Sequence, residues 1–319
     1  MQKSKWRRER LLILCYHGIS LDEEHHWSPG LFLPSDYFRA RLQILKKTGC
    51  NVLPLGEAIQ RLYANDLPEK SVAITFDDGN YDFYEQAYPI IRDFGFPVTL
   101  YLTTFYSHYN RPVFDPMSAY LLWKAQGATL NLKELTGKDA TIDLSEAAGR
   151  AAATDEIRGF ARQHKLSAEE KDDLLVRLAK QLRVDYDELL AKRVLYLMTP
   201  DEVKQVAANG ADIQLHTHRH RTPLDRALFR REIEDNRNDI QSMTGTRASH
   251  FCYPSGVYDP AFLTWLRELG VASATTCDLG VASKDSHPLL LPRFLDSTSL
   301  SPIEFEGWLA GVASLLPRR

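Results

Sequence analysis

Short apolar runs alternate along the chain with longer segments of helical periodicity. The short runs are rich in residues that favour strands, and the longer segments repeat their apolar positions with the period of an α-helix. We predict strands at residues 11–16, 51–53, 71–76, 98–103, 211–216, 250–253, 272–276 and 289–293. We predict helices between them at residues 34–48, 55–65, 81–93, 200–209, 226–244 and 260–268. Repeated strand–helix units of this kind are typical of a parallel α/β barrel.

The alternation stops between about residues 106 and 198, where helical periodicity dominates and few residues favour a strand. Within it, Leu174, Leu175, Leu178 and Leu182 form one apolar stripe. We interpret this segment as a helical insertion carried on one loop of the barrel. Its stripe is expected to pack against the barrel or within the insertion, with a membrane or partner surface as the alternative.

The first ten residues are basic and precede the apolar run at residues 11–15. That run is too short for an export signal and has no small-residue cleavage site after it. Ile13 and Leu14 also stand where a lipoprotein signal has small residues before its cysteine. We therefore expect residues 1–10 to be a solvated basic tail, with weak contact to a membrane surface as the alternative. Residues 11–319 are expected to form a single domain.

Bulk properties narrow the classes of protein further. A chain of 319 residues can bury one large core, and its formal charge of -3 gives no electrostatic reason to expect nucleic acid as a partner. The four cysteines show no CxxC pairing, so we expect reduced thiols rather than disulfides or structural zinc. No apolar run approaches the roughly 20 residues of a membrane span. We expect a soluble cytoplasmic protein, and the sequence leaves its oligomeric state open.

Two adjacent carboxylates end the predicted strand at residues 71–76. Asp77 and Asp78 are followed by Gly79. Carboxylates this close repel each other unless a cation or a shared proton relieves them, or unless their pKa values are driven apart for separate roles. An ordinary Asp-Asp-Gly turn is the alternative.

Three histidines end another predicted strand, at residues 211–216. His216 and His220 are separated by three residues, a spacing that lets two imidazoles bind one ion. Two histidines and one carboxylate match the ligand set of a catalytic zinc or other divalent site. A surface or pH-responsive histidine cluster is the alternative. Because the ends of parallel strands meet on one face of a barrel, we expect these residues to lie near the carboxylates.

A third candidate is the turn at residues 251–256, where Pro254 and Gly256 follow a predicted strand. Such a turn can direct backbone N–H groups into a cavity as an oxyanion hole. An ordinary tight turn is the alternative.

The motifs at residues 75–79 and 216–220 resemble those of the polysaccharide deacetylase family (NodB homology, carbohydrate esterase family 4). The resemblance covers most of the chain outside the insertion, and it implies a distorted (β/α)7 barrel. It also implies that Asp77 is the catalytic base and that Asp78, His216 and His220 bind the metal. Thr217 would stabilise the loop between the two histidines.

Two later motifs depart from the common pattern of the family. The third motif reads Cys252-Tyr253-Pro254, without the arginine that orients the base in many members. Arg293 could replace that arginine from a late strand, with a surface salt bridge as the alternative. The late motif that supplies the acid is not evident. In a subgroup that modifies poly-N-acetylglucosamine, a Tyr-His pair supplies the acid, which implies this role for His17; a structural histidine is the alternative.

The resemblance therefore predicts a hydrolase that removes N-acetyl groups from an amino-sugar glycan or glycan precursor. Ser255 would bind the oxyanion through its N–H, with Tyr253 and Pro254 in the same substrate-binding turn. Zinc is the first candidate for the metal, and cobalt, nickel and iron are alternatives. A deformylase or O-deacetylase on the same scaffold, or a non-catalytic carbohydrate-binding protein, remain open alternatives.

Overall fold

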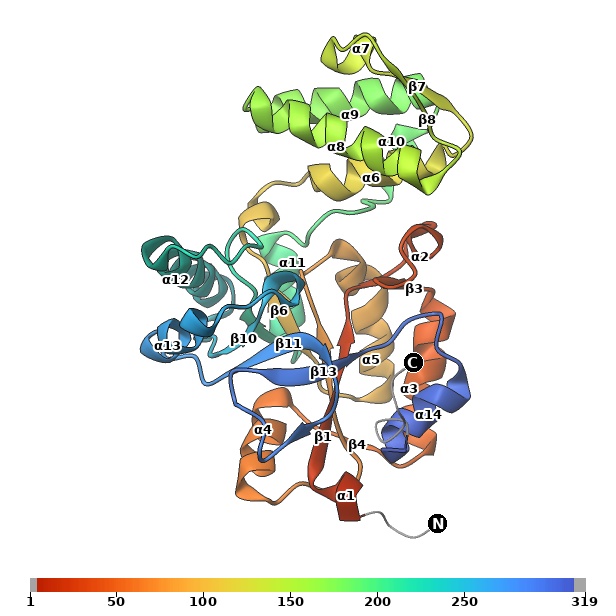
Figure 1. Ribbon diagram of the computed structural model, residues 1–319. Helices are drawn as coiled ribbons and strands as arrows, with labels where there is room; N and C mark the ends of the chain where they lie inside the picture. The colour runs from red at the N-terminus through yellow and green to blue at the C-terminus, as the bar shows by residue number, and fades with distance from the viewer. Residues whose placement is uncertain (1–4, 313–319) are drawn as a thin grey trace. The chain divides into compact units, whose positions relative to one another are not determined.

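Seven parallel strands close into a barrel in the computed structural model, which describes residues 5–312 (Figure 1). Strand β1 pairs with β13 on one side and with β5 on the other, so the order β1-β13-β11-β10-β9-β6-β5 returns to its start. The barrel is distorted, because the register between β11 and β13 shifts between Thr275 and Leu279. The seven strands are β1 (Arg10–Tyr16), β5 (Ser71–Phe76), β6 (Thr99–Leu102), β9 (Asp212–Leu215), β10 (His250–Cys252), β11 (Ser273–Leu279) and β13 (Leu291–Leu295). The predicted (β/α)7 barrel is confirmed.

Alternate side chains of each barrel strand enter two different cores, as the two-residue period of a strand requires. Leu12 and Leu14 of β1 join a large cluster together with residues of the surrounding helices. Leu11 and Ile13 join a smaller cluster with residues of β5, β6, β10 and β13 and with four residues of helix α4 (Leu55–Ala64). Because five of the seven strands of the ring contribute to it, the smaller cluster lies inside the barrel, and α4 packs against it.

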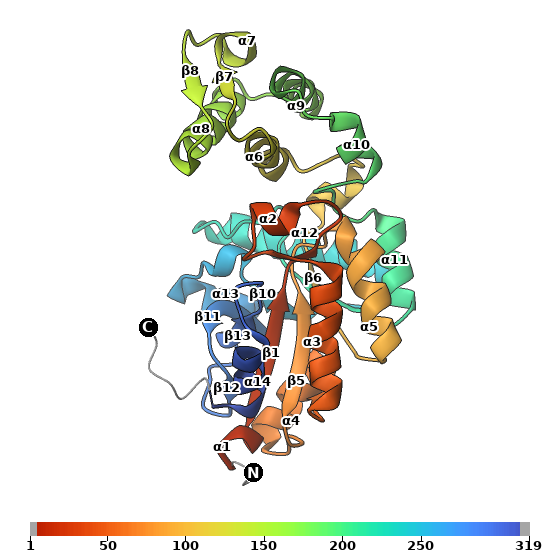
Figure 2. The ribbon, with the colours of Figure 1, turned by 90° about the vertical axis from the view of Figure 1, so that its right-hand side faces the viewer.

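Helices cover the outside of the barrel (Figure 2). Two of them, α11 and α14, begin with capping boxes, in which a Thr or Ser side chain and a Glu three residues later each bond the other's backbone N–H. The covering helices are α3 (Ser35–Lys47), α4 (Leu55–Ala64), a π-helical turn (Phe83–Ala87) that continues into α5 (Tyr88–Phe94), α11 (Pro200–Ala208), α12 (Arg226–Thr244), α13 (Pro260–Glu268) and α14 (Pro302–Ala310).

Several short elements complete this unit. The predicted strand at residues 51–53 is present as β4 (Asn51–Val52), but it pairs only with β5, outside the ring. The sequence did not predict β12 (Ala282–Ser283), which pairs antiparallel with the start of β1. It also did not predict the small parallel sheet of β2 (Gly18–Ile19) and β3 (Phe32–Leu33), or the 3-10 turn Phe105–His108.

Residues 21–27 and 111–196 form a second compact unit. In its core, α6 packs against α8 and α9, and the predicted leucine stripe on α9 is buried there. The unit also contains an antiparallel hairpin of β7 and β8, which the sequence did not predict. Its elements are α2 (Glu24–Trp27), α6 (Phe114–Lys124), β7 (Thr129–Asn131), α7 (Lys133–Thr136), β8 (Thr141–Asp143), α8 (Ala147–Gln163), α9 (Ala168–Leu182) and α10 (Tyr186–Ala191).

Contacts of Asp22, Glu23 and Trp27 hold segment 21–27 in the second unit. Asp22 accepts hydrogen bonds from the hydroxyl of Tyr120 and from the ammonium groups of Lys124 and Lys192. These three donors hold the pKa of Asp22 well below its usual value, although partial burial would raise it. The segment therefore belongs with residues 111–196, from which it is distant in sequence. The interpretation of residues 106–198 as an insertion in the barrel stays a prediction.

The basic start of the chain departs in one respect from the expected solvated tail. Residues 1–4 of this tail lie outside the described residues, and Lys5–Arg8 form the short helix α1. Arg7 is buried, where its Nε donates to the carbonyl oxygen of Leu309 at 2.8 Å and its Nη2 to that of Ser71 at 2.9 Å. The expectation of solvation is therefore wrong for Arg7, which fastens the start of β1 to α14. Across the described part of the chain, the helices are too short or too polar to cross a membrane.

Candidate active site

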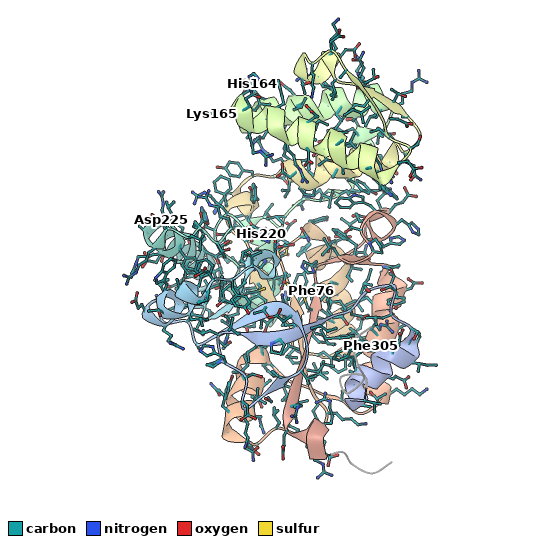
Figure 3. The ribbon with its side chains drawn as sticks, viewed as in Figure 1. Phe76, His164, Lys165, His220, Asp225 and Phe305 are labelled. Atoms are coloured by element: carbon teal, nitrogen blue, oxygen red, sulfur yellow. The ribbon has the colours of Figure 1, made fainter. Side chains whose placement is uncertain are left out.

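The candidate residues lie at the carboxyl ends of the barrel strands. Asp77 follows β5, His216 follows β9 and His17 follows β1. Because the strands of the ring are parallel, their carboxyl ends open on the same face of the barrel. Figure 3 labels Phe76, the last residue of β5, and His220, which lies on the loop after β9. The topology therefore gathers residues from distant parts of the chain.

Asp78, His216 and His220 converge on a common point. Oδ1 of Asp78 lies 3.2 Å from Nε2 of His216 and 3.2 Å from Nε2 of His220. The three ligand atoms all lie within 4.8 Å of one another, close enough for one ion to contact them together. Burial would raise the pKa of Asp78, but the two imidazoles in their protonated form hold it well below its usual value. The structure thus brings together the three residues that the family resemblance implies as ligands.

The hydrogen bonds of His216 indicate which kind of ligand this cluster can bind. Its Nδ1 lies 2.9 Å from the carbonyl oxygen of Cys252, which can only accept, so Nδ1 carries a hydrogen and, in the neutral ring, Nε2 presents a lone pair. That lone pair faces Oδ1 of Asp78, a buried acceptor without a hydrogen-bond partner among the described residues. Two acceptors that face each other need a proton or a metal ion between them. Two imidazoles and one carboxylate are the donors of a catalytic divalent site, so these residues fit such an ion.

The backbone around the cluster is strained. Asp78, Thr217, His220 and Ser255 have positive φ angles of 71°, 64°, 52° and 55°. This left-handed region is uncommon for residues other than glycine, and it is especially unfavourable for a β-branched threonine. Oγ1 of Thr217 accepts the N–H of Arg221 at 3.0 Å, which holds the loop between the histidines in this conformation. Strain of this kind persists where the surrounding structure enforces it, and it concentrates at functional sites.

Asp77 forms a buried ion pair with Arg293. The guanidinium donates two parallel hydrogen bonds of 2.7 Å, Nη1 to Oδ1 and Nη2 to Oδ2. The two side chains are 2% and 1% exposed, so the alternative of a surface salt bridge is wrong. Burial would raise the pKa of Asp77, but Arg293 outweighs it and lowers the pKa to about 2. The carboxylate is thus ionised at neutral pH and has a fixed plane.

His17 lies beside the same carboxylate. Its Nε2 is 3.7 Å from Oδ2 of Asp77, and its Nδ1 is buried without a hydrogen-bond partner among residues 5–312. The alternative of a structural histidine with both nitrogens satisfied therefore does not hold. Burial lowers the pKa of His17, while the carboxylates of Asp77 and Asp78 oppose that effect.

The turn after β10 differs from its expected role at one residue. The side chain of Tyr253 is buried in the core, its hydroxyl donates to the carbonyl oxygen of Leu289 at 3.1 Å, and its N–H donates to that of Thr275 at 3.2 Å. The expectation that Tyr253 contacts substrate is wrong, because both of its donors are used within the barrel. Pro254 has no N–H and can only shape the turn. Ser255 and Gly256 both have a left-handed backbone in this turn, with φ angles of 55° and 68°.

Sequence reasoning missed Asn236, on helix α12. Its Oδ1 accepts the N–H of His216 at 3.0 Å, and its Nδ2 donates to the carbonyl oxygen of Leu102 at 2.9 Å. This fully buried amide therefore joins the ends of β9 and β6 beneath the histidine. The signal was a polar residue on the apolar face of a helix, three residues after Ile233 and four before Ile240.

The middle histidine of the motif does not join the ligand cluster. Nδ1 of His218 lies 2.9 Å from Oγ1 of Thr104 and 3.3 Å from a carboxylate oxygen of Asp239 on α12. It is therefore engaged with the surrounding scaffold, so its place in the sequence motif does not make it a ligand.

A family model described as polysaccharide deacetylase matches residues 64–159 and 170–274, well over half of the chain. The protein belongs to the polysaccharide deacetylase family, which supports a hydrolase that acts on a carbohydrate amide or ester.

Two curated relatives match shorter stretches of the chain. YxkH of Bacillus subtilis is 36% identical over 94 residues, which are 29% of this chain and 32% of that protein. Poly-beta-1,6-N-acetyl-D-glucosamine N-deacetylase of Staphylococcus epidermidis is 33% identical over 113 residues, which are 32% of this chain and 39% of that protein. The chain thus matches less than half of the length of either relative.

Solved structures of similar fold span nearly the whole chain. The Streptococcus pyogenes deacetylase PplD, in complex with acetate, aligns with a TM-score of 0.61 and 20% identity over 97% of this chain and 99% of that one. IcaB from Ammonifex degensii aligns with a TM-score of 0.60 and 17% identity over 95% and 97% of the two chains. At these identities the likeness establishes the fold.

Proposed function

We propose that this protein is a metal-dependent hydrolase that removes N-acetyl groups from an amino-sugar glycan or glycan precursor. The observation that carries the proposal is the convergence of Asp78, His216 and His220 next to the buried carboxylate of Asp77. Membership in the polysaccharide deacetylase family supports the reaction class. The relative from Staphylococcus epidermidis, whose name specifies poly-N-acetylglucosamine, supports an N-acetylated amino sugar as the substrate.

In this proposal Asp78, His216 and His220 hold one divalent ion, with zinc as the first candidate and cobalt, nickel or iron as alternatives. Such an ion, when bound, lowers the pKa of a water molecule and polarises the acyl carbonyl. The carbonyl oxygen of Cys252 fixes the hydrogen of His216 on Nδ1, so that Nε2 is the coordinating atom.

Asp77 is the proposed general base. With a pKa of about 2 it is ionised at neutral pH and can accept a proton from the attacking water. The two hydrogen bonds from Arg293 fix the orientation of the carboxylate. This separates the roles of two adjacent acids: Asp78 coordinates, while Asp77 moves a proton.

His17 is the proposed general acid, and the N–H of Ser255 is the proposed donor to the oxyanion. An amine is a poor leaving group unless it is protonated as the C–N bond breaks. His17 stands at the carboxyl end of β1, with its Nε2 3.7 Å from Oδ2 of Asp77; burial lowers its pKa, and the carboxylates of Asp77 and Asp78 oppose that effect without outweighing it. An N–H directed at the developing negative charge stabilises the transition state more than the substrate.

Elemental analysis combined with acyl-release assays tests the proposal. The panel contains N-acetyl oligosaccharides, their O-acetyl counterparts and N-formyl analogues. We expect a stoichiometric divalent ion, acetate release from the N-acetyl compounds, loss of release after chelation and recovery when zinc is returned. Release only from O-acetyl or N-formyl compounds would identify an O-deacetylase or a deformylase. A metal-loaded protein that binds the oligosaccharides but releases no acyl group would identify a carbohydrate-binding protein.

The class of glycan depends on where the protein works. A cytoplasmic location, which stays a prediction from the sequence, favours a glycan precursor over a finished exported polymer. Contact of the basic tail with a membrane surface also stays a prediction. The panel should therefore include both short N-acetyl oligosaccharides and long polymers, and preference for the long polymers would argue against a precursor.

A further inference from the structure

Three thiols surround the Asp77–Arg293 ion pair. Sγ of Cys252 lies 3.4 Å from Oδ2 of Asp77 and 3.1 Å from Nη2 of Arg293. Sγ of Cys15 lies 3.8 Å from the same carboxylate oxygen, and Sγ of Cys277 lies 3.8 Å from the same guanidinium nitrogen. Cys252 is the thiol that contacts both members of the pair at the shortest distances, and the proposed reaction gives it no role.

The thiol of Cys252 can satisfy both neighbours at once. It is fully buried, and burial disfavours the thiolate, so the sulfur carries its hydrogen. A thiol has one weak donor and a weakly accepting sulfur. The carboxylate of Asp77 can only accept and the guanidinium of Arg293 can only donate. The arrangement is therefore S–H to Oδ2 and Nη2–H to Sγ, which closes a ring with the direct contact between Nη2 and Oδ2.

The same residue also reaches the proposed ligand cluster through its backbone. The carbonyl oxygen of Cys252 accepts the hydrogen of His216 Nδ1 at 2.9 Å. Strand β10 pairs in parallel with both β9 and β11. This pairing fixes the position of Cys252 along the strand direction, between Asp77 and His216. Its side chain contacts one half of the site, and its main chain contacts the other.

We infer that Cys252 is a positioning residue for the proposed reaction. Its thiol helps to fix the plane of the Asp77 carboxylate and the position of the Arg293 guanidinium. The inference rests on the proposed function. It differs from a packing role, because packing requires only the volume of the side chain, whereas this role requires its hydrogen-bond donor.

Substitution of Cys252 by Ala and by Ser separates these two roles. Ala removes the donor, and we expect kcat to fall about tenfold, the effect of one hydrogen bond to a charged group, with KM and metal content unchanged. Ser restores a donor and should recover kcat to within about threefold of the wild type, which is less than the cost of one such bond. Cys50→Ser is the matched control, because Cys50 is half-buried beside Thr48 and takes no part in the site. A Cys252→Ala enzyme with wild-type kcat would overturn the inference. It would also be overturned if kcat fell equally in the Ala and Ser variants and the fall in kcat matched a loss of thermal stability.

An infrared measurement tests the contact without any assay of activity. The difference spectrum between the wild type and Cys252→Ala isolates the S–H stretching band of Cys252. A hydrogen bond to a carboxylate lowers that frequency, so Asp77→Asn should raise it towards that of a free thiol. An unchanged band in Asp77→Asn would refute the contact. If the wild type releases no acyl group, the proposed function fails, and the band still decides whether the thiol bonds Asp77.

Discussion

The two halves of the candidate active site, the ligand cluster and the base with its arginine, are built in opposite ways. In the ligand cluster, Oδ1 of Asp78 has no hydrogen-bond partner among the described residues, and His220 exposes 37% of its side chain. In the other half, both oxygens of Asp77 are bonded by Arg293, and the carboxylate is 2% exposed. The carboxylates belong to adjacent residues, yet Oδ1 of Asp78 has no hydrogen-bond partner among the described residues, whereas both oxygens of Asp77 are bonded.

The difference follows from the work that each half is proposed to do. A ligand must keep a lone pair for the ion, and its backbone is held in a left-handed conformation to aim that lone pair. A base must stay ionised with a fixed plane, which a buried bidentate arginine provides. Changes in the ligand cluster should therefore act on metal content, and changes around Asp77 should act on turnover or stability with the metal retained.

The largest expected effect comes from exchanging the two carboxylates for amides in turn. Asp77→Asn removes the proton acceptor, and we expect kcat to fall by about 10²- to 10⁴-fold while the metal stays bound. Asp78→Asn should instead lose the metal. Acetate release and elemental analysis of both variants make the comparison, with the exposed Asp201→Asn as a control. Loss of metal from Asp77→Asn would show that the two halves are not separate.

Removal of Arg293 should disrupt the half of the site that contains Asp77, and the effect should be a loss of folding stability. Arg293→Met leaves the carboxylate of Asp77 buried without its partner, which we expect to cost about 3–5 kcal/mol in the free energy of unfolding. Urea denaturation measures this cost. The double variant Asp77→Asn, Arg293→Met should recover part of it, because no charge then stays buried. A single variant as stable as the wild type would mean that other groups neutralise Asp77.

Substitution of Asn236 tests the ligand half of the site, because this residue supports the metal ligand His216 in the proposal. Asn236→Leu removes the bonds to the N–H of His216 and to the carbonyl oxygen of Leu102, so we expect metal affinity to fall by about 10- to 100-fold. Competition with a chelator measures the affinity, and kcat at saturating metal should change less. Asn238→Leu, on the exposed side of the same helix, is the matched control. Equal affinities in both variants would remove Asn236 from the site.

The smallest expected effect is the loss of folding stability at low pH. The pKa of Asp77 is lowered from 3.8 to about 2 in the folded protein, so the folded state binds this proton less readily than the unfolded chain. The contribution to stability is complete above pH 3.8 and is lost as the pH falls through about 2. It amounts to about 2 kcal/mol. Urea denaturation of metal-free protein from pH 5 to pH 2 measures it, and Asp77→Asn should lack this component; an identical slope in both would contradict the assignment.

Much of the fold was predictable because barrel strands are buried on both faces. Residues 11–16 form a continuous apolar run and residues 71–76 a nearly continuous one, and such runs indicate parallel strands between two cores. The same reasoning could not separate β4 from the strands of the ring, because a strand of two residues is too short to show a pattern. The hairpin of β7 and β8 escaped prediction because its strands are only three residues long and largely polar.

The residues of the candidate site were likewise predictable only in part. The spacing of His216 and His220 suggested a shared ion, and the family resemblance implied the separate roles of Asp77 and Asp78. Tyr253 was misassigned because its motif says nothing about which way its side chain points, and the barrel turns it into the core.

By itself, the sequence determined the alternation of strands and helices, and it determined the two motifs whose residues are neighbours along the chain. Only the tertiary structure decided that Arg293 reaches Asp77 across 216 positions, that Cys252 bonds the ring of His216 and that Asn236 bonds its backbone N–H. The physical reason is that local patterns record the period of a strand or helix. Contacts between strand ends depend on the register and closure of the whole barrel, which no local pattern contains.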